Sequence, residues 1–167
     1  RLSDGLAGLK PGEADCVVIA GMGGELIIHI LEEGRGLWDT IGYWVLSPQS
    51  ELDKVRRFLE KESFSIARET MMKEDGKYYT VMGVTRDGIS WDYTSEPHYL
   101  YGRRLIRQKS PVLAEFLKKE QEQLEQILDT LKDSDTPAAL NRRGEMEAML
   151  AWNKEAQDEM LGTDTEA

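Results

Sequence analysis

The sequence predicts an α/β fold in which parallel strands end in an antiparallel hairpin and are followed by an α-helical hairpin. Two short apolar runs alternate with helical patterns over residues 16–59, which indicates two strand–helix units. An Asp-Gly pair between two further strand-like segments indicates the antiparallel hairpin. The character of the sequence changes at Pro97. We therefore expect an α/β domain over residues 1–96, a helical coiled-coil extension over residues 97–161 and a frayed tail over residues 162–167.

The first two strands are expected to be parallel neighbours. The run from Cys16 to Ala20 is apolar throughout, which is typical of a strand covered on both faces. The turn Gly21-Met22-Gly23-Gly24 follows it, and then a helix over residues 25–33 that Gly34 closes. The next strand runs from Tyr43 to Leu46. Because strand–helix–strand crossovers are right-handed, these strands belong to a parallel sheet.

A second helix and a strand hairpin complete the predicted domain. The helix begins at Gln49 or Ser50. Its apolar face consists of Leu52, Val55, Phe58 and Leu59. The hairpin consists of a strand over residues 64–72, a tight turn over residues 74–77 and a strand over residues 78–84.

Two amphipathic helices are expected after the α/β domain. In the first of them, Ser110 supplies an N-cap and Pro111 occupies the first helical position. Its apolar residues recur at three- and four-residue steps: Val112, Leu113, Phe116, Leu117, Leu124, Ile127, Leu128 and Leu131. The segment from Asp133 to Pro137 breaks the helix. The second helix is lined by Met146, Met149, Leu150 and Trp152. Two such helices joined by a short turn form a helical hairpin.

Composition narrows the classes of function. The chain has 167 residues, with 1 cysteine and 2 histidines. No apolar run reaches the roughly 20 residues that span a bilayer, and no secretory leader is recognisable. A single cysteine excludes an internal disulfide, and so few histidines do not make a zinc site unless carboxylates contribute. We therefore expect a cytoplasmic protein with no metal and no membrane partner.

The charge distribution leaves nucleic-acid binding open. A formal net charge of −10 argues against it, because such binding depends on neutralising phosphates with Lys and Arg. The acidic residues, however, are concentrated in the last third of the chain. Basic residues cluster at Arg103, Arg104, Arg107 and Lys109. They lie within about two helical turns, so several of them can face one phosphate-lined surface.

The glycine-rich turn is the strongest local sign of a ligand site. Backbone amides at a strand-to-helix turn can approach a ligand closely where glycine has no Cβ. Alternatively, these glycines only make a tight turn. The pattern is neither GxGxxG nor a P-loop. In open α/β sheets, ligands lie beyond the carboxyl ends of the strands. The residues expected there are Ala20, Gly21, Met22 and Gly23, together with Ser47, Pro48 and Gln49.

Other chemistry-bearing residues give weaker signals. Asp4, before Gly5, could accept a hydrogen bond from an adenine amino group or could be an ordinary turn residue. His29 lies among apolar neighbours in a predicted helix, which favours packing. No Ser-His-Asp or Cys-His set has workable spacing, since Cys16 lies inside a predicted strand. The catalytic residues, if there are any, stay unknown.

Several segments taken together resemble a known family. They are Asp4-Gly5-Leu6, Ile19 to Gly24, Leu46 to Gln49 with Val55 to Leu59, Glu74 to Tyr79, and Tyr101 to Arg104. In this order and spacing they resemble the TrmK family, bacterial tRNA (adenine-N1)-methyltransferases that act on adenosine 22 of tRNA. The resemblance covers nearly the whole chain. It implies a Rossmann-like class I methyltransferase sheet, S-adenosyl-L-methionine as cofactor, tRNA as partner and a coiled-coil extension.

The resemblance also implies roles for particular residues. Asp4 and Gly5 would lie near the adenine of the cofactor, and residues 20–23 near its methionine part and the target base. Family members often have Gln-Pro-Asn at residues 47–49, and Gln49 keeps an amide that can pair with adenine. The family's first glycine-rich loop and its ribose-binding acid lie upstream of Arg1. We therefore expect the chain by itself to be inactive.

Three further expectations stay open. The helical hairpin could serve as an interaction or dimerisation module without catalysis, because its apolar stripe can pair in trans. A Rossmann-type oxidoreductase is a second alternative, although GxGxxG is absent. The strand from Cys16 to Ala20 would have one unpaired edge. We expect this edge to be covered by a homodimer partner or by the segment from Arg1 to Lys10.

Overall fold

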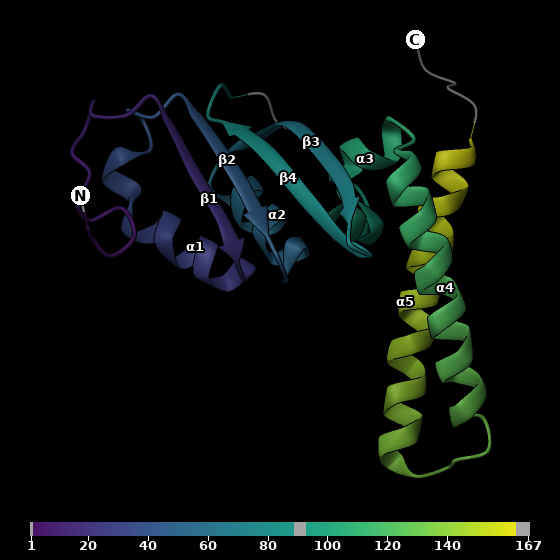
Figure 1. The fold of residues 1–167 in the computed structure, drawn as a ribbon. Coiled ribbons are helices and arrows are strands. Elements are labelled where there is room, and N and C mark those ends of the chain that lie inside the picture. The colour runs from purple at the N-terminus through teal and green to yellow at the C-terminus, as the bar shows by residue number, and fades with distance from the viewer. Residues whose placement is uncertain (1, 89–92, 163–167) are drawn as a thin grey trace. The chain divides into compact units, whose positions relative to one another are not determined.

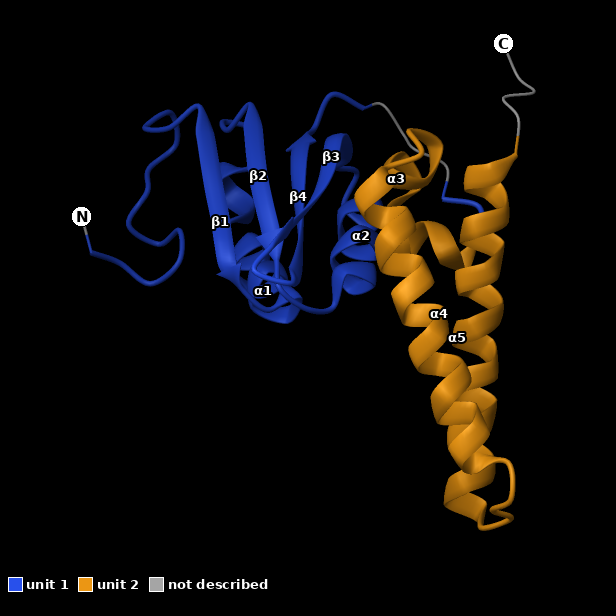
Figure 2. Ribbon diagram, turned by 45° about the vertical axis from the view of Figure 1, so that its right-hand side comes forward, with its two compact units in different colours: residues 1–94 blue, residues 95–167 orange. Residues whose placement is uncertain are grey.

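The computed structural model describes residues 2–88 and 93–162 of the chain. The chain divides into two compact units, Arg1–Thr94 and Ser95–Ala167 (Figure 2). Of the expected frayed tail, residues 163–167 lie outside the described residues. The first unit contains a sheet with two helices, and the second unit is helical.

The sheet of the first unit has four strands in the order β1-β2-β4-β3 (Figure 1). They are β1 (Cys16–Met22), β2 (Tyr43–Pro48), β3 (Ser65–Glu74) and β4 (Lys77–Thr85). β1 and β2 are parallel, whereas β4 is antiparallel to both β2 and β3. The predicted α/β fold, with parallel strands followed by an antiparallel hairpin, is confirmed.

The hairpin turn has the conformation that its sequence predicts. Asp75 and Gly76 both have positive φ, 48° and 76°. Two consecutive residues in this region make a type I′ turn, whose twist matches that of the flanking strands.

Two helices pack against the sheet, α1 (Gly24–Glu33) and α2 (Leu52–Lys61), and a short 3-10 helix (Arg35–Leu37) follows α1. The core forms where apolar helix residues meet those of the sheet, among them Ile19, Ile27, Leu31, Trp44, Leu46, Val55, Phe58, Leu59, Met82 and Val84. Gly34 ends α1 as predicted, and its N–H donates to the carbonyl of Ile30 at 3.1 Å.

The expectation that β1 is covered on both faces is wrong for the described residues. Ile19 is 5% exposed, because it points into the core, whereas Val18 is 67% exposed on the opposite face. β1 also lies at the edge of the sheet, with β2 as its neighbour (Figure 1). The described residues of the segment from Arg1 to Lys10 form no strand beside it. β1 therefore has more apolar residues than the first unit buries.

The start of α2 differs from the prediction. The helix begins at Leu52 instead of Gln49 or Ser50. Glu51 has φ 48° and ψ 42°, in the left-handed region that a right-handed helix cannot include. The residues between Pro48 and Leu52 are therefore a loop at the end of β2.

The second unit contains a helical hairpin, as predicted. A π-helix (His98–Gly102) and α3 (Arg103–Arg107) precede α4 (Pro111–Leu131) and α5 (Pro137–Leu161). α4 and α5 lie side by side in Figures 1 and 2. The predicted N-cap is present, since the Ser110 hydroxyl accepts a hydrogen bond from the N–H of Leu113 at 3.4 Å.

Fewer apolar residues of α4 are buried than its pattern predicts. Those that are fully buried are Leu113, Leu117 and Leu124, and the other members of the predicted stripe are half-buried. On α5, Met146 is the buried member of the predicted lining. The other buried residues of α5 were not predicted, and they are Ala139, Asn153, Ala156 and Met160. The buried faces therefore combine apolar residues with a polar side chain that the pattern does not indicate.

Candidate functional site

Two loops meet where the parallel strands end. We define the β1–α1 turn as residues 20–24 and the β2–α2 loop as residues 47–51, which includes the last residues of β2. The N–H of Gln49 donates to the carbonyl of Met22 at 3.0 Å, and the N–H of Gly24 donates to the carbonyl of Ser50 at 3.1 Å. The structure thus brings together the two segments that the sequence predicts at the carboxyl ends of the strands.

The backbone at Gly21 is open to an approaching ligand. Gly21 has φ +79°, a backbone conformation that residues with a side chain rarely adopt. A Cβ built on Gly21 would have no atom within 4 Å. The pairing of β1 with β2 shifts register between Ala20 and Met22. Ala20 and Gly21 are both exposed, and Met22 is half-buried. Glycine is required here by conformation, and the exposed backbone is free of side-chain cover.

The other two glycines of the turn face the protein. A Cβ at Gly24 would lie 2.6 Å from the carbonyl oxygen of Ser50 and 2.9 Å from the Cγ2 of Val55. A Cβ at Gly23 would lie 3.0 Å from the hydroxyl of Ser50. Contacts this short force a neighbour to move. Tight packing between the two loops therefore accounts for glycine at both positions without a ligand.

Glu51 joins the two loops through its side chain. Its carboxylate accepts hydrogen bonds from the N–H of Gly24, at 3.1 Å, and from the hydroxyl of Ser50. The Ser50 hydrogen bond, followed by the backbone N–H groups of Gly24 and Glu25, holds the pKa of Glu51 below its ordinary value. Sequence reasoning missed this residue, because nothing in its neighbours indicates a contact 27 positions away.

The position of Glu51 bears on the oxidoreductase alternative. A dinucleotide pyrophosphate binds at the N-terminus of the helix after a glycine-rich turn, where backbone N–H groups point at it. In this chain the carboxylate of Glu51 already occupies the N-terminus of α1. An anion at this turn would meet a negative charge, which argues against a pyrophosphate site here.

The three candidate residues of the β2–α2 loop have different surroundings. The hydroxyl of Ser47 donates to the carbonyl of Thr80 on β4 at 3.1 Å. Pro48 is buried, whereas Gln49 is exposed. The side-chain amide of Gln49 is therefore more accessible for a hydrogen bond to a planar base than the ring of Pro48 is for stacking on one.

Asp4 and Gly5 are not brought to the β1–α1 turn. Gly5 lies beside Ile30, since a Cβ built on it would be 3.5 Å from the Cγ1 of Ile30. Leu6 lies beside Gly34, since a Cβ built on Gly34 would be 2.5 Å from the Cδ1 of Leu6. These contacts lie toward the C-terminal end of α1, and a helix of 10 residues is about 15 Å long. The structure therefore leaves the expected adenine-side residues apart from residues 20–23.

The candidate basic residues lie on α3 and in the turn that follows it. Leu105 and Ile106 are buried. At 100° per residue, Arg103, Arg104 and Arg107 lie on the opposite side of the helix, where Arg107 is exposed and Arg103 and Arg104 are half-buried. Lys109 lies beyond the helix with φ 51°, and its ammonium donates to the carbonyl of Gly162 at 3.0 Å. Its position is therefore tied to the end of α5.

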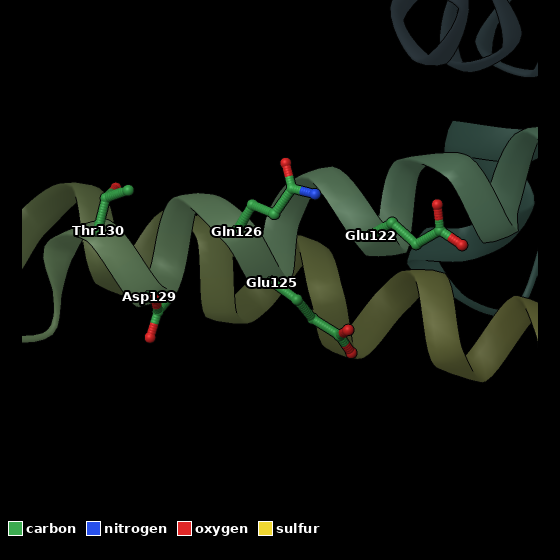
Figure 3. A pocket seen from close by; sticks show the side chains of 5 residues that line it. All are labelled: Glu122, Glu125, Gln126, Asp129 and Thr130. Carbon is green, nitrogen blue, oxygen red and sulfur yellow. The ribbon is translucent and has the colours of Figure 1, made fainter.

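An open hollow on α4 is acidic. Figure 3 shows the side chains that line it, which are Glu122, Glu125, Gln126, Asp129 and Thr130. None of them is a predicted site residue. Three carboxylates repel phosphates, so this part of α4 is unsuited to a nucleic-acid backbone.

Two kinds of feature are absent from residues 2–88 and 93–162. No group of three or more His, Cys, Asp and Glu side chains there is arranged to hold a metal ion. Within the same residues, no helix combines the length and apolar character needed to cross a membrane.

Sequence comparison relates the chain to known methyltransferases. The model of a family described as TrmK, tRNA (adenine(22)-N(1))-methyltransferase, matches residues 1–155. The tRNA (adenine(22)-N(1))-methyltransferase of Bacillus subtilis is 37% identical over 128 residues, which cover 75% of this chain and 52% of that protein. The chain thus spans about half the length, or less, of the curated relatives it matches.

Structure comparison agrees. The crystal structure of the B. subtilis m1A22 tRNA methyltransferase TrmK is 32% identical, with a TM-score of 0.77, and covers 93% of this chain and 68% of that one. A Streptococcus pneumoniae protein in complex with S-adenosyl-L-methionine is 30% identical, with a TM-score of 0.77 over 93% and 66% of the two chains. A Listeria monocytogenes protein described as uncharacterised has a TM-score of 0.86 at 25% identity, over 93% and 68%.

Proposed function

The chain belongs to the TrmK family of tRNA (adenine(22)-N(1))-methyltransferases, and from this we propose that the whole protein methylates N1 of adenosine 22 in tRNA. The observation that carries the proposal is the pair of joined loops at the carboxyl ends of β1 and β2. In this type of sheet, ligands bind at that edge. The donor would be S-adenosyl-L-methionine, which the S. pneumoniae relative binds.

The β1–α1 turn fits part of a site for this cofactor. Ala20 and Gly21 are exposed, and the space beside Gly21 is open, so a ligand can approach its backbone closely. We assign Ala20, Gly21, Met22 and Gly23 to the methionine side of the cofactor. Asp4 and Gly5 are proposed for its adenine side, which requires the segment before β1 to lie nearer the turn than it does here. When bound, the cofactor supplies a methyl group made electrophilic by a sulfonium.

The β2–α2 loop is proposed to hold the target base. Ser47 and Pro48 shape the loop, and the exposed amide of Gln49 can pair with the edge of adenine. The lone pair of adenine N1 is already nucleophilic, so placement of the base matters more than a strong catalytic base. The target adenine must leave its stack to reach this edge of the sheet.

The face of α3 that carries Arg103, Arg104 and Arg107 is proposed as a contact for tRNA phosphates, with Lys109 beside it. Three guanidinium groups on one helix face can neutralise neighbouring phosphates without reading sequence. Since tRNA and its modifying enzymes meet in the cytoplasm, the proposal includes a cytoplasmic location.

The test is methyl transfer by the whole protein to an unmodified tRNA. We expect labelled methyl groups at N1 of adenosine 22, and none in a matched tRNA that has guanosine at position 22. Methylation at another position, or no methylation of either tRNA under conditions in which the cofactor binds, would contradict the proposal.

A second candidate function is a dimerisation module without catalysis. The helical hairpin would serve this role, because the half-buried apolar residues of α4, such as Val112, Ile127 and Leu128, form a stripe that can pair in trans. The two candidates differ in one measurement. A module of this kind would dimerise with full affinity when the β1–α1 turn is mutated, whereas a methyltransferase would lose activity.

A further inference from the structure

We propose that Glu51 is a positioning residue, which fixes the β1–α1 turn against the β2–α2 loop so that the methyl donor and the target base meet in reacting geometry. This inference rests on the proposed function and deepens it. Glu51 touches neither the cofactor nor the base in this scheme. It acts through the two loops that are proposed to hold them.

The Glu51 side chain bridges the two loops. Helix α1 has no side-chain cap of its own, since its N-cap residue is Gly23. The carboxylate of Glu51 takes that role from another segment of the chain by accepting from the N–H of Gly24 at 3.1 Å. It also accepts from the hydroxyl of Ser50, within its own loop. One side chain thus connects the start of α1 to the loop after β2.

The backbone conformation of Glu51 is unusual for a residue with a side chain. Glu51 has φ 48° and ψ 42°, a left-handed conformation that glycine or asparagine adopts more easily. A strained residue of this kind persists where its surroundings determine it, and such residues cluster at functional sites. In this conformation the Glu51 carboxylate reaches the N–H of Gly24 at the start of α1.

The charged neighbours of Glu51 make a different kind of contact. Lys54 of α2 forms an ion pair with Glu25 of α1, and both side chains are more than half exposed. Exposed pairs of this kind contribute little to stability because solvent screens them. Glu25 therefore carries a negative charge at the same helix end without bridging the two loops. It provides a matched control for the bridge.

Loss of the Glu51 bridge is expected to affect the rate of the chemical step. Without the bridge, each loop keeps its own backbone and its own contacts with a ligand. What changes is how firmly one loop is placed relative to the other, because only the backbone hydrogen bonds from Gln49 to Met22 and from Gly24 to Ser50 still join them. A displacement of about 1 Å between reacting groups can cost about 100-fold in rate. Loss of Glu51 should therefore lower kcat while leaving the binding of both substrates nearly unchanged.

The experiment compares Glu51→Ala, Glu51→Gln and Glu25→Gln in the whole protein. We expect kcat of Glu51→Ala to fall about tenfold or more, with KM for cofactor and for tRNA within about twofold of wild type. Glu51→Gln keeps the length and one acceptor oxygen, so its kcat should stay within about threefold of wild type. Glu25→Gln should match wild type.

Amide hydrogen exchange gives a readout that does not depend on activity. In Glu51→Ala the amides of Gly24 and Glu25 should exchange faster, while that of Ile27 in the same helix keeps its rate. Unchanged exchange together with unchanged kcat would overturn the proposal. So would a rise in KM with kcat preserved, or an equal loss of kcat in Glu25→Gln. If the wild-type protein transfers no methyl group, the proposed function fails, and the exchange rates alone decide whether the bridge exists.

Discussion

At the scale of single residues, the β1–α1 turn combines two different requirements for glycine. Gly21 is needed for its positive φ, and its exposed backbone is available to a ligand. Gly24 is needed because the β2–α2 loop packs against it, with the Ser50 carbonyl 2.6 Å from where a Cβ would be. One short motif therefore serves both the fold and the proposed site.

Replacement of Gly24 by alanine tests the packing requirement. The added methyl group would collide with backbone atoms of Ser50 and Glu51, which cannot rotate away. We expect Gly24→Ala to lower the free energy of unfolding by about 1–3 kcal/mol, as overpacking does. Urea denaturation of the whole protein measures it.

Gly144 provides the control for that experiment. It lies inside α5, and a Cβ built on it has no atom within 4 Å. Gly144→Ala should raise the free energy of unfolding by about 0.5–1 kcal/mol, because alanine loses less entropy in a helix. If both substitutions change stability equally, the close contact at Gly24 does not exist in solution.

At the scale of elements, a polar network joins the π-helix, α4 and α5. Asn153 is fully buried and donates to the Leu117 carbonyl at 3.0 Å and to the Glu120 carboxylate at 2.9 Å. The hydroxyl of Tyr101 donates to the same carboxylate at 2.6 Å. Buried polar groups that satisfy one another fix a single register between helices. The network therefore specifies how this helical hairpin pairs.

The network predicts a pH dependence of stability. Burial first, and then the neighbouring carboxylate of Glu120, raises the pKa of Tyr101 above its ordinary value of 10.0. A folded pKa above the unfolded one contributes stability that is present below pH 10 and is lost as the pH rises beyond it. We expect thermal unfolding measured between about pH 8 and pH 11 to show this decline in wild type. The decline should be smaller in Tyr101→Phe, and equal curves would contradict the prediction.

The basic face of α3 predicts a salt effect on tRNA binding. Reversing the charge of Arg103 and Arg104 in the whole protein should weaken binding to all tRNA sequences alike. The dependence of log K on log salt should flatten by about 1 for each phosphate that the variant no longer neutralises. Filter binding at several salt concentrations measures both quantities.

A charge reversal at the other end of the helical hairpin is the control for α3. Arg142 is exposed and pairs with Glu145 at 3.2 Å. Arg142→Glu should leave the affinity and the salt slope as in wild type. If Arg103 and Arg104 behave in the same way as Arg142, α3 does not contact tRNA.

At the scale of the whole molecule, β1 has a neighbouring strand on only one side among the described residues, and it carries an exposed apolar residue, Val18. We expect the 167-residue chain by itself to form a homodimer that covers this edge or the adjoining sheet face, with the C-terminal helices adding apolar contact. Sedimentation velocity should show the dimer, and Val18→Lys should weaken it. A monomer at all concentrations would refute the expectation.

Cofactor binding should also depend on how much of the protein is present. The 128 residues that match the B. subtilis relative cover 52% of that protein. Within it, the proposed cofactor contacts are confined to the β1–α1 turn and the segment around Asp4. We expect residues 1–167 alone to bind S-adenosyl-L-methionine with a Kd weaker than about 1 mM, and the whole protein to bind far more tightly. Calorimetry that finds tight binding by the short chain would contradict this.

The sequence by itself determined the local elements. Apolar runs, the Asp75-Gly76 turn, the Ser110 cap and Gly34 each act over a few residues, so their patterns predict the strands, the hairpin and the helix ends. The order of strand and helix patterns also predicted that residues 20–23 and 47–49 would lie at one edge of the sheet, because parallel strands end together.

The tertiary structure decided which polar residues are buried and what the glycines contact. Arg56 and Asn153 are fully buried, although both side chains are polar. The guanidinium of Arg56 lies 2.7 Å from the carboxylate of Glu69, and Asn153 lies inside the helical hairpin. Glu51 reaches Gly24 across 27 positions of sequence. It also decided that β1 has one open face. Each of these depends on residues distant in sequence coming together, and periodicity within one segment carries no information about its partners.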